Sequence, residues 1–107
     1  MAKKEETISS ATVYENVLGC KWSRQIMRLI DTGVVRPGAI TNAVDGLTTK
    51  VQTDCLKRMT ALGILNRTEF AEIPPRVEYE LTDIGEKFIG ILNAVEALQE
   101  DIDNRKK

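Results

Sequence analysis

The residues best suited to chemistry are short polar and cationic side chains within residues 46–67. At about 100° per residue, one side of a helix there would carry Lys50, Thr53, Asp54, Lys57 and, at its edge, Arg58. Lysine and threonine can hydrogen-bond to base edges, aspartate can accept from cytosine, and cations can pair with phosphate. The pattern is suited to reading DNA, and the alternative is a solvated surface helix.

The other side of this helix is made to pack, because Val51, Cys55, Met59 and Leu62 share one quarter of its circumference. We expect the helix to run from about 48 to 62 and to end at Gly63. Thr49 and Gln52 have the spacing of a capping box, and Thr48 is the alternative cap.

The composition offers little for catalysis or metal binding. The chain has 107 residues with two cysteines and no histidine. Structural zinc usually takes four nitrogen or sulfur ligands, and histidine is the commonest general base. The sequence contains no P-loop, dinucleotide-binding or nucleophile-elbow motif. We therefore expect a protein that is not an enzyme and has no cofactor or metal.

Length and hydropathy indicate one domain that does not enter a membrane. The chain lacks an apolar run long enough to span a bilayer, and its first ten residues lack the apolar centre of a signal peptide. We expect a cytoplasmic protein with a mobile tail over 1–8, a domain over 9–103 and a frayed tail over 104–107.

Charge is unevenly distributed, although the net charge is only −1. Residues 34–68 hold five cations and two acids, a local charge of +3. Residues 69–103 hold ten acids and two cations, a local charge of −8. A basic face on a near-neutral protein can still attract phosphate, because the local field governs encounter.

Three helices are expected before the 48–62 helix. Helical spacing of apolar residues predicts helices over 10–18 and 21–31, and Trp22 is expected to anchor the second in the core. Pro37 suits the first turn of a short helix that reaches about 43. A short helix, a turn at Asp45-Gly46 and a longer helix form the helix-turn-helix order.

After Gly63 the hydrophobic pattern changes to that of strands. We expect strands over 64–69 and 77–81, with a loop at 70–76 that contains Pro74-Pro75. Two strands around a short loop make a hairpin, the wing over 64–81. The expected fold is therefore α+β, mainly α: a winged helix-turn-helix with a two-stranded wing and a long C-terminal dimerisation helix.

That last helix is expected over 82–103. It carries an apolar seam spaced 4, 3, 4, 3 and 4 residues apart, formed by Ile84, Phe88, Ile91, Val95, Leu98 and Ile102. A helix this long cannot bury its whole seam against so small a domain. We therefore expect these residues to form a dimer interface, and the alternative is a helix that packs only on its own domain.

The chain resembles the HxlR-type winged helix-turn-helix transcriptional regulators, relatives of the MarR group, over about residues 9–98. The residues that carry the resemblance are GCKW at 19–22, GLT at 46–48, Leu56, Met59, GILNR at 63–67 and IPPRVEYELTDIG at 73–85. The resemblance implies a homodimer that binds a pseudopalindromic operator in double-stranded DNA.

Three departures from the family bear on sensing and on the helix that precedes the recognition helix. Some members respond to thiol-reactive or small organic compounds through an N-terminal cysteine, which by spacing corresponds to Ser9-Ser10 here. Cys20 stands where a second glycine is usual. Arg36 is kept, but the aromatic residue that usually follows it is replaced by Pro37.

In a helix-turn-helix, the first turns of the recognition helix enter the major groove. The expected DNA-binding residues are Arg36, Thr48, Thr49, Lys50, Thr53, Asp54, Lys57, Arg58 and Arg76. Lys57, Arg58 and Arg36 are expected on phosphate, and Arg76 either on the minor groove or in a salt bridge. With roughly four cations per subunit on phosphates, the affinity of a dimer should fall with salt at a logarithmic slope of about −7.

Other functions remain open at this point. The winged helix could be a protein-protein interaction module, as its low net charge would allow. It could also be a repressor that responds to an unidentified small-molecule effector near Trp22 and the last helix, or to oxidation at Cys20 beside Lys21. Cys20 as a small residue in a packed turn, and Cys55 as a core residue, are the alternatives to redox chemistry.

Overall fold

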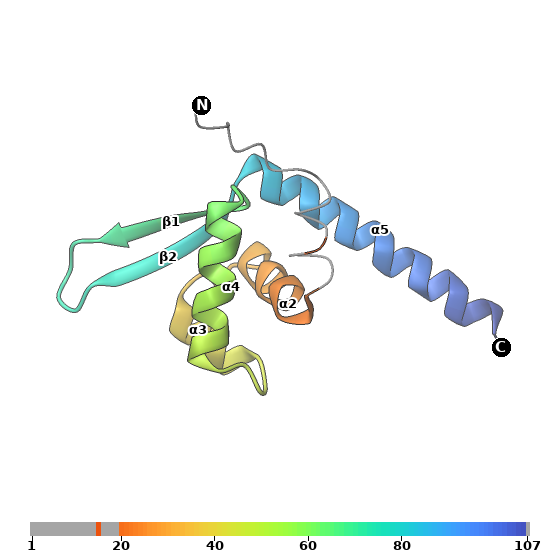
Figure 1. Cartoon of the computed structure of the whole chain (residues 1–107), viewed down its shortest axis with the longest axis horizontal. Coiled ribbons are helices and arrows are strands. Elements are labelled where there is room, and N and C mark those ends of the chain that lie inside the picture. The colour runs from red at the N-terminus through yellow and green to blue at the C-terminus, as the bar shows by residue number, and fades with distance from the viewer. Residues whose placement is uncertain (1–14, 16–19, 107) are drawn as a thin grey trace, which may run out of the picture.

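A computed structural model of the chain describes residue 15 and residues 20–106. The elements in this part are α2 (Lys21–Asp31), α3 (Pro37–Ala43), α4 (Thr49–Ala61), β1 (Leu65–Phe70), β2 (Arg76–Leu81) and α5 (Asp83–Arg105) (Figure 1). This order confirms the predicted winged helix-turn-helix with a long C-terminal helix. The helix predicted over 10–18, apart from residue 15, and the tail predicted over 1–8 lie outside the described residues.

The core forms where α2 meets α4 and the base of the hairpin. α2 contributes Ile26, Met27 and Ile30, all nearly or fully buried, and Ile40 of α3 is also fully buried. Trp22 packs against this cluster but remains half-buried, so it lies at the rim of the core.

The start of α4 differs from the preferred prediction. The Thr48 hydroxyl accepts a hydrogen bond from the Val51 backbone N–H at 3.2 Å, so Thr48 is the N-cap. Thr49 is already the first helical residue. The capping-box spacing of Thr49 and Gln52 is therefore not used, because Gln52 is buried and makes a tertiary contact instead.

The wing is a single antiparallel hairpin in which Leu65 pairs with Leu81 and Phe70 pairs with Arg76. Both strands extend one residue further toward the loop than predicted, because the Arg76 guanidinium lies over the Phe70 ring at 3.8 Å. The Tyr79 N–H donates to the Val35 carbonyl at 3.0 Å, which joins β2 to the segment between α2 and α3.

α5 begins inside the domain and then leaves it. The Thr82 hydroxyl accepts from the Gly85 N–H at 3.1 Å and lies 3.1 Å from the Ile64 carbonyl, so it both caps α5 and contacts the chain just before β1. The buried residues of α5 are Gly85, Phe88, Ile89 and Leu92. Beyond them the helix projects from the body of the fold (Figure 1) and continues to Arg105, two residues past the predicted end.

No helix in the described part of the chain is long and apolar enough to cross a membrane.

Candidate nucleic-acid interface

The outward face of α4 carries the residues expected to read bases. Lys50, Thr53, Asp54 and Lys57 are all exposed, as are Thr48 and Thr49 at the first turn. The inward face carries the buried residues Gln52, Cys55, Leu56 and Met59. The division predicted from periodicity is therefore present, except that glutamine is part of the packed face.

Asp54 forms an ion pair with Lys50, one turn earlier, at 3.3 Å. Both side chains are exposed, so water and salt screen this attraction and it adds little stability. Lys50 is consequently free to exchange Asp54 for a base or phosphate at small cost. The ion pair with Lys50 also accounts for the presence of Asp54 on this face, so no capping role is needed to explain it.

Lys57 and Arg58 differ from Lys50 because neither has a carboxylate partner among the described residues. Lys57 is exposed, and Arg58 is half-buried at the edge of the packed face. An unpaired cation on this face can bind a phosphate without first losing an ion pair. These two residues are thus the readiest phosphate ligands on α4.

Gln52 supports α4 from its packed side, and the predicted site residues do not include it. Its side-chain oxygen accepts from the Thr41 hydroxyl on α3 at 2.7 Å, and that hydroxyl also lies 3.1 Å from the Pro37 carbonyl. Gln52 is only 2% exposed. The contact sets α4 against α3, and its signal in the sequence is a glutamine on an otherwise apolar face.

The two predicted DNA-binding arginines outside α4 are both paired with acids of the hairpin or its loop. Arg36, the residue before α3, lies 3.5 Å from Glu78. Arg76 lies 2.8 Å from Glu72 and 2.6 Å from Glu78, in addition to its contact with the Phe70 ring. Of the two roles predicted for Arg76, the salt bridge is the one present in the free chain.

Arg76 and Glu72 hold each other in their charged forms. Hydrogen bonding to Arg76 lowers the pKa of the Glu72 carboxyl, and hydrogen bonding to Glu72 and then Glu78 raises the pKa of the Arg76 guanidinium. The arginine at the wing therefore carries little uncompensated positive charge.

The α5 seam divides between the core and solvent. Phe88 is only 8% exposed and packs in the core of its own domain, so it is not available to the predicted dimer interface. The side chains of the other five residues are between 41% and 60% exposed: Ile84, Ile91, Val95, Leu98 and Ile102. An apolar row of this length on a projecting helix is available for a second copy of the chain.

Arg28 fixes α5 to α2 through contacts that the sequence did not reveal. Its guanidinium donates to the Asn93 side-chain oxygen at 2.6 Å and pairs with Glu96 at 2.8 Å. Asn93 and Glu96 follow the last buried residue of α5, Leu92. This link holds the seam at a set angle to the helix that supports α4.

Cys20 lies at the N-cap position of α2 and is half-buried, while Cys55 is buried in the core on α4. Burial raises the pKa of the Cys20 thiol, but the nearby polar groups of Ser23 and the Trp22 backbone N–H favour the thiolate more, so the pKa is lowered.

The small-molecule site expected near Trp22 and the last helix does not coincide with the cavity beside α2. An open cavity of about 400 Å³ lies beside α2, lined by Lys21, Gln25, Arg28, Leu29, Ala43, Val44 and Asp45. Trp22 does not line it. Among the described residues no group of three or more histidine, cysteine or acidic side chains could hold a metal ion.

The family model described as HxlR-like helix-turn-helix matches residues 17–107. The chain belongs to the HxlR-like family. A helix-turn-helix transcriptional regulator of Methanothermobacter thermautotrophicus is 33% identical to it over 91 residues, 85% of this chain and 70% of the relative. This HxlR-like chain is accordingly a transcriptional regulator of the helix-turn-helix type.

Solved structures agree with this assignment. A crystal structure from Enterococcus faecalis V583, described as a transcriptional regulator of the MarR family, is 31% identical with a TM-score of 0.81 and covers 99% of this chain and 96% of its own. The redox regulator HypR in its reduced form is 26% identical with a TM-score of 0.76, covering 87% of this chain and 92% of its own. The HxlR-like chain thus shares its winged fold with both proteins.

Proposed function

We propose that the protein regulates transcription as a homodimer that binds a pseudopalindromic operator in the cytoplasm. α4 enters the major groove, where Thr48, Thr49, Lys50, Thr53 and Asp54 face the base edges. The wing lies on the flanking backbone or minor groove. The observation that carries this proposal is the exposed outward face of α4, which combines base-reading side chains with the unpaired cations Lys57 and Arg58.

The exposed seam of α5 supports the dimer. Five large apolar side chains on one helix face, from Ile84 to Ile102, are costly to leave in water. Pairing two copies of α5 removes them from water and presents two α4 helices together. Half-sites should then lie about one helical turn, roughly 10 bp, apart.

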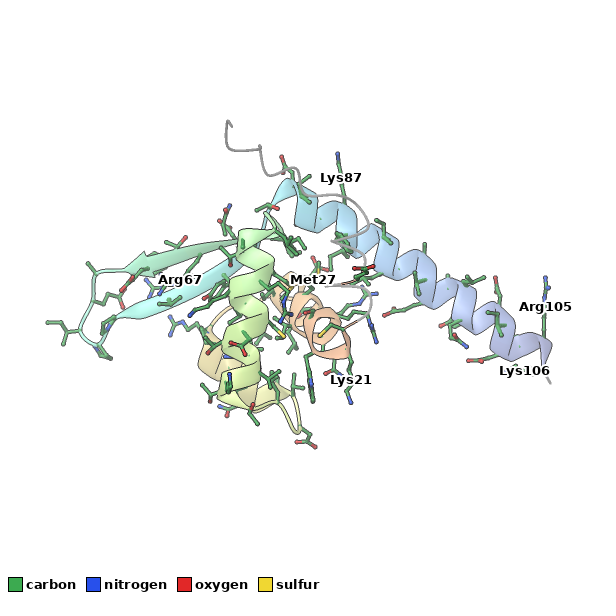
Figure 2. The ribbon with its side chains drawn as sticks, in the orientation of Figure 1. Lys21, Met27, Arg67, Lys87, Arg105 and Lys106 are labelled. Carbon is green, nitrogen blue, oxygen red and sulfur yellow. The ribbon has the colours of Figure 1, made fainter. Side chains whose placement is uncertain are left out.

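The test is selection of duplexes from a random pool by the purified protein, followed by a mobility-shift assay on the selected site. Lys57→Ala should weaken binding by about tenfold, through loss of one phosphate contact per half-site. Lys87→Ala is the matched control. This lysine stands out from α5 into solvent (Figure 2), so the substitution removes the same charge at a position away from α4. Equal effects of the two changes, or no selected site, would contradict the proposal.

A second candidate function adds a response to oxidation at Cys20. It is favoured by the lowered pKa of this thiol and by the likeness to HypR, whose description is that of a redox regulator. A winged helix that only binds other proteins is the remaining alternative, and it would show no salt-dependent affinity for any duplex.

A further inference from the structure

Ile73, in the loop of the wing, is the most exposed large apolar side chain in the described part of the chain, with a relative exposure of 101%. The other five such side chains, between 41% and 60% exposed, all belong to the α5 seam. The wing and the far end of α5 extend from the helices in opposite directions (Figure 1). Pairing of two seams therefore leaves Ile73 in water.

The loop that carries Ile73 is braced by the residue that follows it in β2. The Arg76 guanidinium lies over the Phe70 ring at 3.8 Å. The same guanidinium pairs with Glu72 at 2.8 Å and with Glu78 at 2.6 Å. Two prolines follow Ile73 directly, and their rings fix φ. Ile73 is therefore presented on a stiff support, so less conformational entropy is lost when a partner buries it.

The charges of the wing do not favour contact with phosphates. Residues 65–81 hold two cations and four acids, a local charge of −2. Within the loop at 71–75 the charged residue is Glu72, which is paired with Arg76, and the other side chains are apolar. Attraction to phosphate therefore does not hold the wing on DNA, and the apolar tip is the part that can come close.

The wing is fixed relative to the helix-turn-helix. The Tyr79 N–H donates to the Val35 carbonyl at 3.0 Å, and Arg36 lies 3.5 Å from Glu78. Both contacts join β2 to the segment that leads into α3. When α4 lies in the major groove and two copies pair through α5, each wing points away from the dimer axis. Its tip then meets the minor groove on the outer side of a half-site.

We propose that Ile73 enters this outer minor groove and inserts as an apolar wedge between two base pairs. The proposal rests on the proposed function, because it needs α4 in the adjacent major groove. Proteins that insert isoleucine, leucine or proline in this way partly unstack the base step and kink the duplex. Removal of the exposed side chain from water offsets the lost stacking.

The wedge makes Ile73 a specificity-determining residue that makes no hydrogen bond to a base. An isoleucine side chain has no polar atom with which to read base edges. Its preference must come from the free energy of deforming the step, which is lowest at flexible pyrimidine–purine steps such as TA and CA. We therefore expect such a step at a fixed distance outside each half-site.

The sequence preference is tested by selecting duplexes from a random pool with the full chain. The unaltered protein and Ile73→Leu should both enrich a pyrimidine–purine step on each outer flank. Ile73→Ala should select the same half-sites without the flanking steps, and should bind the original site about tenfold more weakly. Thr68→Ala is the control, because Thr68 is an exposed residue of β1 outside the loop, and it should change neither result.

Insertion itself is measured with 2-aminopurine placed at the enriched flanking step, because its fluorescence rises when the base is unstacked. At saturating protein, the unaltered chain and Ile73→Leu should raise the fluorescence, and Ile73→Ala should not. Thermal unfolding should be the same for all variants, since Ile73 is fully exposed, and this separates a lost wedge from a damaged fold. No rise with the unaltered chain, or an equal rise with Ile73→Ala, would overturn the proposal.

The outcomes distinguish this inference from the proposed function. A selected site that Lys57→Ala weakens and Ile73→Ala does not would overturn the wedge and leave DNA binding by α4 in place. That is the result expected if Ile73 contacts another protein instead. Selection of no duplex by the unaltered chain would overturn both proposals.

Discussion

The Thr41 hydroxyl on α3 lies 2.7 Å from the side-chain oxygen of Gln52 on α4, and this contact sets the two helices of the helix-turn-helix against each other. Gln52 is 2% exposed, and a buried amide without a hydrogen-bond partner would destabilise the fold. The orientation of the outward face of α4 depends on this buried pair as well as on the apolar core.

Substitutions of Gln52 should separate the packing role from the polar role. Gln52→Ala should lower the free energy of unfolding by about 2 kcal/mol, because it leaves a cavity and removes the amide partner. Gln52→Leu should lower it by less than about 1 kcal/mol, because leucine fills the space and the Thr41 hydroxyl keeps the Pro37 carbonyl. Urea unfolding measures both, and equal losses would contradict this account.

Two glycines of α5 should respond in opposite directions to alanine. A Cβ on Gly85 would clash with the Ile64 carbonyl and press on Leu81, whereas nothing lies within 4 Å of a Cβ on Gly90. Gly85→Ala should destabilise the fold by about 1–3 kcal/mol. Gly90→Ala should stabilise it by about 0.5–1 kcal/mol through helix propensity. Thermal unfolding of the two variants tests the close approach of α5 to the chain before β1.

A carboxylate placed in the α5 seam should prevent dimerisation. Val95→Glu and Leu98→Glu each put a charge among the exposed apolar residues, which a paired helix could not bury. Ala97→Glu is the control, because it adds the same charge to an exposed position outside the seam. Light scattering should give monomers for the seam variants and dimers for Ala97→Glu. Dimers in all three would remove the seam from the interface.

The salt dependence of DNA binding should reflect which cations are already paired. Arg36, Lys50 and Arg76 have carboxylate partners, and Lys57 and Arg58 have none among the described residues. If the pairs persist on DNA, a dimer neutralises about four phosphates and the logarithmic slope should be about −4, in place of the −7 expected from counting cations. Fluorescence anisotropy in a sodium chloride series measures it.

Release of Arg76 provides the control for that slope. The double change Glu72→Gln and Glu78→Gln removes both partners of Arg76 and also the partner of Arg36, so it should steepen the slope by about 4, two phosphates per subunit. A slope that stays the same would show that neither arginine reaches phosphate even when unpaired.

Local sequence signals were sufficient for most element boundaries. Pro37 at the first turn of α3, Thr82 before α5 and the alternation around Tyr79 each act within a few residues, and the described elements follow them closely. The preferred cap of α4 was wrong by one residue because the capping-box pattern counts Gln52 as a local partner. Its actual partner, Thr41, belongs to another helix.

The sequence by itself determined the winged helix-turn-helix, the two faces of α4 and the apolar seam, because periodicity and capping depend on neighbours along the chain. Tertiary structure decided which charges are already neutralised, that Phe88 belongs to the core, and that Gln52 pairs with Thr41. Those outcomes depend on distances between elements far apart in sequence, such as α2 with α4 and α5, and periodicity within one element carries no information about them.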